Sequence, residues 1–137
     1  MKALRNSFFG HALAVGLGLS LLAIAPFNAK AAELIMLEQD GCYWCEIWNE
    51  EIGIAYPKTE EGKQAPLRRL DIHADLPPDL KGLKKANYTP TFVLWHNGRE
   101  VDRLRGYPGS HFFWPMLQQM LSKLDTQAAD DAPASKS

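Results

Sequence analysis

The chain has 137 residues, a length that suits one domain with a single modest core. Its 15 basic and 16 acidic residues nearly cancel, and no stretch forms a basic stripe. This charge pattern argues against a protein that binds nucleic acid.

The N-terminal segment, residues 1–31, has the features of a secretory signal peptide. Lys2 and Arg5 make its start positive, residues 12–26 are apolar apart from Gly and Ser, and Ala29-Lys30-Ala31 is a small-x-small cleavage signal. A retained membrane anchor is the alternative, but the apolar run is shorter than the roughly 20 residues that cross a bilayer. No cysteine lies near the cleavage site to carry a lipid. We therefore predict cleavage after residue 31 and export, with no stable membrane insertion afterwards.

Cleavage removes three basic residues and no acidic residue, which leaves 106 residues with a net charge of −4. We assign residues 32–126 to one folded domain. Residues 127–137 are rich in Ala, Asp and Ser and are predicted to be a disordered tail. Both cysteines stay in the exported domain and meet an oxidising compartment, where a lone pair can form a disulfide.

The first half of the domain predicts a strand, a helix and a second strand. Leu34–Leu37 is a short apolar run typical of a buried strand. From Cys42 onward apolar residues recur at intervals of three and four, which predicts a helix that closes at Gly53 and Pro57. The remaining predictions are a charged loop over 58–64, a strand within 66–72 and one helical turn within 76–82.

The second half predicts a hairpin and a closing helix. Thr91–His96 is rich in β-branched and aromatic residues, and Asn97-Gly98 behind it is a strong hairpin signal that makes Val101–Leu104 the antiparallel partner. Phe112–Leu124 is amphipathic, with Pro115 in its expected first turn. The element order predicts an α/β fold with a mixed four-stranded sheet and flanking helices.

The pattern Cys42-Tyr43-Trp44-Cys45 lies directly after the first predicted strand and opens the first predicted helix. Unpartnered backbone N–H groups and the positive end of the helix dipole favour a thiolate at Cys42 and lower its pKa. The thiolate is the species that attacks a disulfide. Cys45, one turn further on, is placed to resolve the mixed disulfide that forms on Cys42.

Three other uses of the cysteine pair are weaker. A purely structural disulfide would close a loop too short to constrain the unfolded chain much. A metal site would need further ligands, and no histidine of the exported chain has metal-site spacing to the pair. Haem attachment would need a histidine after Cys45, where Glu46 stands.

A second signal is Thr89-Pro90-Thr91, at the entrance of the strongest strand. A proline there is compatible with a cis peptide bond, which proteins retain for a purpose. An ordinary trans proline that marks the strand start is the alternative. The cysteine pair favours the cis form, with Pro90 opposite the cysteine turn.

Together these motifs resemble the thioredoxin superfamily. The matching features are G-C-Y-W-C after an apolar strand, T-P-T before the next strong strand, W-H-N-G-R as its hairpin and R-G-Y-P-G-S before the closing helix. They span residues 34–124. More narrowly, the chain resembles the small periplasmic thioredoxins associated with bacterial sulfur-oxidation gene clusters, so the resemblance implies a periplasmic location.

The resemblance implies a role for each motif. Cys42 would be the catalytic nucleophile and Cys45 the resolving thiol, and the two would form the redox disulfide without a cofactor or metal. Pro90 would be the cis-proline, and the Thr89 backbone would pair with an extended substrate segment. Gly106 would leave room for the partner. That partner would be a periplasmic protein disulfide or thiol, such as a cysteine of a sulfur-carrier protein, and a membrane-bound or soluble electron donor would recycle the pair.

The sequence also departs from the family. The usual first strand and helix are lacking, and Met36 takes the place of the buried Asp that assists exchange, a role left to Glu38 or water. Tyr43 and Trp44 replace the usual Gly-Pro and offer an apolar substrate contact. No histidine lies between the cysteines, which favours a reductant or isomerase over a strong oxidant. A non-catalytic redox-sensing module and, less favoured, a metal chaperone remain alternatives.

Overall fold

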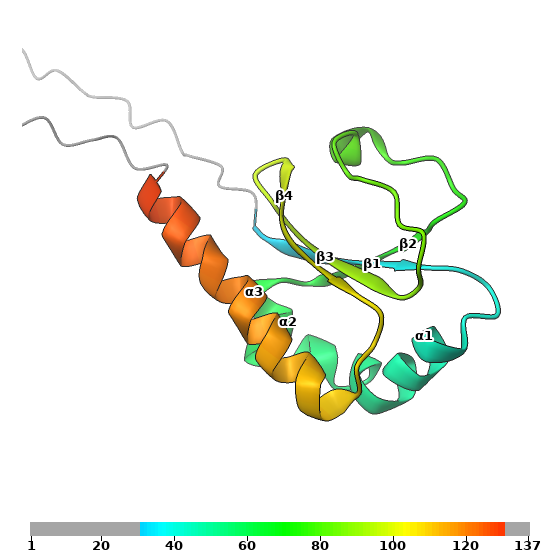
Figure 1. The fold of residues 1–137 in the computed structure, drawn as a ribbon. Coiled ribbons are helices and arrows are strands. Elements are labelled where there is room, and N and C mark those ends of the chain that lie inside the picture. The colour runs from blue at the N-terminus through cyan, green and yellow to red at the C-terminus, as the bar shows by residue number, and fades with distance from the viewer. Residues whose placement is uncertain (1–30, 131–137) are drawn as a thin grey trace, which may run out of the picture.

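The computed structural model describes residues 31–130, with side chains through residue 126 (Figure 1). Residues 1–30 of the predicted signal peptide lie outside the described residues. Within 31–130 no helix combines the length and hydropathy that a membrane crossing requires. The elements in chain order are β1 (Glu33–Glu38), α1 (Tyr43–Trp48), a π-helical turn η1 (Asn49–Gly53), a 3-10 turn η2 (Tyr56–Lys58), α2 (Glu60–Gln64), β2 (Leu67–Asp71), a 3-10 turn η3 (Pro78–Leu80), β3 (Thr91–His96), β4 (Arg99–Arg105) and α3 (Ser110–Asp130).

The four strands form one mixed sheet in the order β2-β1-β3-β4. Strand β1 runs parallel to β2 and antiparallel to β3, and β3 pairs antiparallel with β4. This topology confirms the predicted fold class. In the β1–β3 register Leu37 lies opposite Thr91, so the last residues of β1 and the first residues of β3 lie at the same end of the sheet. The segment between β1 and Cys42 and the segment that ends at Pro90 therefore both lie at that end of the sheet.

The core has two layers because alternate residues of β1 and β3 point to opposite faces. On the helix side, Met36 and Phe92 pack with Trp48 and Phe113. On the other side, residues of β1 and β3 that include Val93 pack under the loop between β2 and β3, which rises above the sheet in Figure 1. Strands covered on both faces need continuous apolar runs, which is what made them recognisable in the sequence.

Several predicted elements are confirmed with adjusted bounds. The first helix continues past Trp48 into the turn η1, and the predicted helical turn is η3. At the β3–β4 hairpin Asn97 has φ 50° and Gly98 φ 76°, the left-handed backbone that a tight hairpin requires. The hairpin partner is longer than predicted, since β4 covers Arg99–Arg105.

The predicted loop over 58–64 is wrong, because residues 60–64 form α2. Thr59 caps this helix: its Oγ1 accepts a hydrogen bond of 3.0 Å from the Gly62 N–H. Gly62 fits because any Cβ there would lie 1.9 Å from the Tyr56 carbonyl oxygen. The Tyr56 hydroxyl in turn donates to the Ala65 carbonyl at 2.7 Å, which fixes the far end of α2.

Helix α3 starts earlier and ends later than predicted. Gly109, with φ 89°, directly precedes it and its carbonyl accepts from Phe113, so Pro115 is the sixth helical residue and not in the first turn. The helix also runs to Asp130, four residues into the predicted tail 127–137. The rest of that tail lies outside the described residues.

Candidate active site

The two cysteines form a disulfide at the start of α1, with their Cα atoms 5.3 Å apart. Cys42 is the N-cap residue, with extended backbone, and its Sγ lies 3.2 Å from the Cys45 backbone N–H. The same N–H also donates to the Cys42 carbonyl oxygen at 3.0 Å, so the carbonyl and the sulfur share one donor of the first helical turn. A backbone N–H this close to Sγ favours the thiolate of Cys42 over its thiol.

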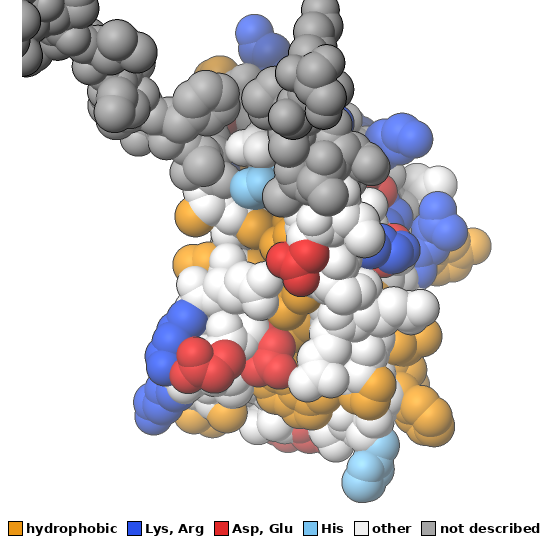
Figure 2. Space-filling view, turned by 90° about the vertical axis from the view of Figure 1, so that its left-hand side faces the viewer, with side chains coloured by type: hydrophobic (Ala, Val, Ile, Leu, Met, Phe, Trp, Pro, Cys, Tyr) orange, Lys and Arg blue, Asp and Glu red, His pale blue; other side chains and the backbone are white. Residues whose placement is uncertain are grey.

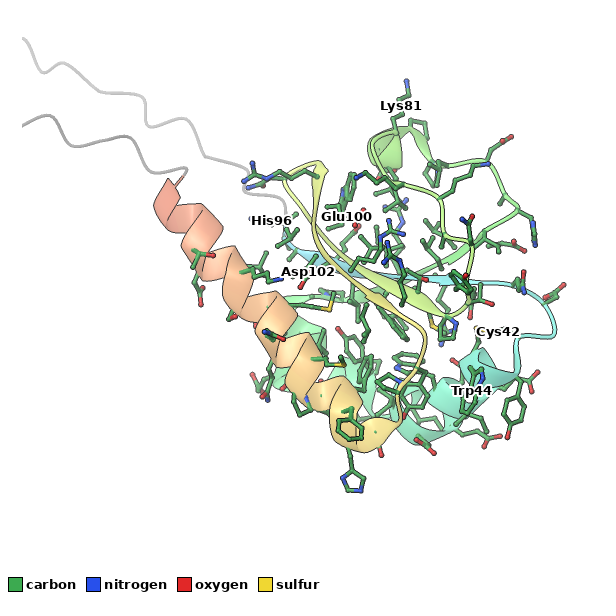
Figure 3. The ribbon with its side chains drawn as sticks, viewed as in Figure 1. Cys42, Trp44, Lys81, His96, Glu100 and Asp102 are labelled. Carbon is green, nitrogen blue, oxygen red and sulfur yellow. A yellow bond between two sulfur atoms is a disulfide. The ribbon has the colours of Figure 1, made fainter. Side chains whose placement is uncertain are left out.

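The four residues of the motif separate into an inner and an outer pair. Cys42 and Cys45 are 7% and 3% exposed and belong to the helix-side core, whereas Tyr43 and Trp44 are 63% and 54% exposed. The two rings meet edge-on with centroids 5.3 Å apart. Figure 3 shows Trp44 beside Cys42 on the solvent side of α1. The two cysteines are thus largely shielded from solvent, and the exposed rings of Tyr43 and Trp44 form an apolar surface next to them.

The Thr89–Pro90 peptide bond is cis, as the sequence predicts, and Pro90 is buried at the entrance of β3. The Pro90 carbonyl accepts a 2.8 Å hydrogen bond from the Gly106 N–H. Gly106 has φ 80°, and a Cβ built there would meet no atom within 4 Å. Pro90 and Gly106 therefore lie together at the end of the sheet where β1 continues toward Cys42. The space around Gly106 is open.

Two residues that sequence reasoning did not assign to the site hold this loop. The Tyr107 hydroxyl donates to Glu51 Oε2 at 2.6 Å and so ties the residue after Gly106 to the helical turn behind Cys45. Burial, together with the carboxylate of Glu51, raises the pKa of Tyr107 well above its ordinary value. The sequence offered only the R-G-Y-P-G motif as a signal, because the two partners are far apart along the chain.

A polar hollow of about 380 Å³ borders both cysteines on the β2 side. Arg69 of β2 lines it, donating to Glu38 Oε2 at 2.7 Å and to Asn49 Oδ1 at 2.6 Å. The same guanidinium lies 5.6 Å from the Trp48 ring centroid and 3.6 Å from the Met36 sulfur. An arginine–glutamate pair thus lies beside Met36. Met36 and Glu38 are expected at the site from the sequence, whereas no sequence signal points to Arg69 or Asn49.

Further apolar side chains are exposed at the start of α3. Figure 2 shows them near the lower end of the face it presents, and Phe112 and Met116 are the exposed large apolar residues of this helix. Within residues 31–130, no group of three or more His, Cys, Asp or Glu side chains is arranged to hold a metal ion.

Comparison with solved structures identifies a similar protein that is itself periplasmic. This protein is the periplasmic thioredoxin SoxS from Paracoccus pantotrophus, whose crystal structure is of the reduced form. The two sequences are 44% identical, and the match covers 68% of this chain and 98% of that chain. The two structures superimpose with a TM-score of 0.64. A thioredoxin from Malassezia sympodialis is 20% identical over 68% of this chain and 77% of that chain, with a TM-score of 0.49. No family model and no curated protein matches the chain.

Proposed function

Because the chain belongs to the thioredoxin family, we propose that it is an exported thiol–disulfide oxidoreductase that reduces or exchanges disulfides of a partner protein. The observation that carries this proposal is the cysteine pair itself: one sulfur accepts a backbone N–H at the start of a helix, and the second lies three residues behind it. The predicted signal peptide and the similarity to a periplasmic thioredoxin support the periplasm as its compartment.

The exchange proceeds in two steps. The Cys42 thiolate attacks one sulfur of the partner disulfide, which forms a mixed disulfide and releases the other partner sulfur as a thiolate. Cys45, after losing its proton, then attacks the Cys42 sulfur and releases the second partner thiolate. Two electrons pass to the partner, and the enzyme is left in the oxidised form described here. A membrane-bound or soluble dithiol donor returns it to the reduced state.

The surroundings of the sulfurs supply the docking contacts for this reaction. The backbone of Thr89, before the cis-proline, pairs with an extended partner segment, and Gly106 leaves space for that segment. The exposed rings of Tyr43 and Trp44 contribute apolar contact area. A cysteine of a sulfur-oxidation carrier protein, kept active by reduction, is the partner that the family resemblance favours.

The test is a pair of cysteine variants. Cys42→Ser is expected to abolish turnover of a test disulfide, while Cys45→Ser keeps the nucleophile and accumulates a mixed disulfide with the native partner in periplasmic extracts. Stoichiometric partner binding without turnover by the parent protein would instead favour the redox-sensing module. A Cys42→Ser protein that still turns over disulfide would refute the proposal outright.

A further inference from the structure

A broad trough lies along the edge strand β4. It has a volume of about 650 Å³ and lies between residues 84–88, which precede the cis-proline, and residues 100–105 of β4. Figure 3 shows Glu100 on β4, with the loop that carries Lys81 above it. Arg103 Nη2 donates to the Lys84 carbonyl at 2.9 Å and so holds the two walls together.

The charges in this trough do not cancel. Its two acidic side chains are already engaged: Glu100 accepts from Arg103 at 2.7 Å, and Asp102 accepts from Lys123 of α3 at 2.6 Å. Three basic residues remain on the walls: Lys84, Lys85 and Arg105. None of the three forms an ion pair with another residue of the described range. The trough therefore carries a surplus of positive charge on a chain that is slightly acidic overall.

The trough leads directly to the candidate active site. Arg105 lies opposite Thr91 in the β3–β4 register, and the next residue, Gly106, donates to the Pro90 carbonyl at 2.8 Å. Tyr88, which ends the other wall, is 70% exposed and directly precedes Thr89. A chain segment that pairs with the Thr89 backbone at the disulfide therefore has the basic trough as its continuation.

From this continuity and charge we propose that the trough binds an acidic, extended segment of the partner protein, next in sequence to the cysteine that reacts with Cys42. The inference rests on the proposed function. A carboxylate-bearing peptide fits because three cations line a short trough beside an edge strand that pairs with another strand on one side only. A long polyanion would meet the acidic remainder of the chain beyond the trough.

The test compares two synthetic peptides that differ only in charge. Each carries one cysteine in a mixed disulfide with a chromogenic thiol, flanked on one side by four Glu in the first peptide and four Gln in the second. We expect the reduced protein to release the thiol from the Glu peptide with a kcat/KM about tenfold higher at low salt. The factor follows because each surface charge contact is worth roughly twofold to threefold. High salt should erase the preference.

Charge variants locate the effect. K84Q/K85Q should lower the preference for the Glu peptide to about threefold, and adding R105Q should remove it. The matched control K58Q/K63Q removes two exposed lysines on the helix side of the sheet and should keep the parent preference. An equal loss in the control, or a parent protein with no preference at low salt, would overturn the proposal.

A binding measurement separates this inference from the proposed function. Peptides with Ser in place of Cys cannot react, so their affinities report the trough alone. Tighter binding of the Glu peptide that is lost in K84Q/K85Q/R105Q supports the trough. This holds even if the protein turns over neither disulfide peptide. The missing turnover would then count against the proposed oxidoreductase activity and not against the trough. Equal affinities for the two Ser peptides at low salt would refute the trough whatever the catalytic result.

Discussion

Gly106 and Gly98 form a matched pair that separates backbone strain from substrate access. Both have positive φ, 80° and 76°, and a Cβ at either position would meet nothing within 4 Å. They differ in place: Gly106 donates to the Pro90 carbonyl beside the disulfide, whereas Gly98 lies at the β3–β4 hairpin turn. Substitution by Ala therefore strains the backbone equally, but it adds a methyl group to the candidate substrate site only at Gly106.

The expected cost in stability is modest for both variants. An L-residue in the left-handed region costs about 1–2 kcal/mol, and neither position adds a steric clash. For a domain of this size, that free energy corresponds to a fall in Tm of roughly 5–10 °C. In activity the variants should differ: Gly106→Ala should lower kcat/KM for a peptide disulfide about tenfold, equivalent to about 1.4 kcal/mol of transition-state binding, while Gly98→Ala leaves it unchanged.

The assay is reduction of a peptide disulfide followed by released thiol, with thermal unfolding of both variants measured in parallel. A small linear disulfide such as hydroxyethyl disulfide serves as a second substrate, because it needs no extended groove and should lose much less rate in Gly106→Ala. Equal rate losses in both variants, or no loss at Gly106 despite the expected fall in Tm, would show that the open space there does not serve the substrate.

The remaining predictions concern contacts inside the domain. Tyr107→Phe should lower the free energy of unfolding by about 1 kcal/mol in urea titrations, because its hydroxyl loses the bond to Glu51, whereas the exposed Tyr43→Phe should change it by less than about 0.5 kcal/mol. Burial raises the pKa of Tyr56 above the ordinary value of about 10, so above that pH the unfolded chain loses a proton that the folded chain keeps; stability should fall as pH rises, and less steeply in Tyr56→Phe. Gly62→Ala should destabilise by about 3 kcal/mol, because its Cβ would strike the Tyr56 carbonyl; a gain in stability, the usual effect of Ala in a helix, would contradict the packing described here.

The sheet was predictable because its signals are local. Four consecutive apolar residues made β1 recognisable, and Asn97-Gly98 fixed the β3–β4 hairpin through the backbone angles it allows. The cysteine pair was predictable for the same reason, since its spacing and its place between a strand and a helix lie within one short segment. The cis peptide bond before Pro90 was expected because Thr89-Pro90-Thr91 occurs together with the cysteine pair, and the structure confirms it.

The parts that escaped prediction depend on contacts between distant segments. Helix α2 has only five residues, and it is held by the Thr59 cap and by the close approach of Gly62 to Tyr56, neither of which a periodicity count detects. The bond between Tyr107 and Glu51 joins residues 56 positions apart. The basic trough likewise unites residues 84–88 with β4, so its charge appears in the sequence only as scattered basic residues.

The hollow beside Cys45 bears on how the second exchange step releases its proton. The family resemblance matches the buried acid of thioredoxins to Met36, which is fully buried behind this hollow's Arg69, with the guanidinium 3.6 Å from its sulfur. The Glu38 carboxylate accepts a hydrogen bond of 2.7 Å from Arg69, so its nearer oxygen is engaged in an ion pair. The hollow itself borders Cys45 and is large enough for several water molecules. We therefore expect water in this hollow to accept the Cys45 proton, with the Arg69–Glu38 pair fixing the hollow's shape.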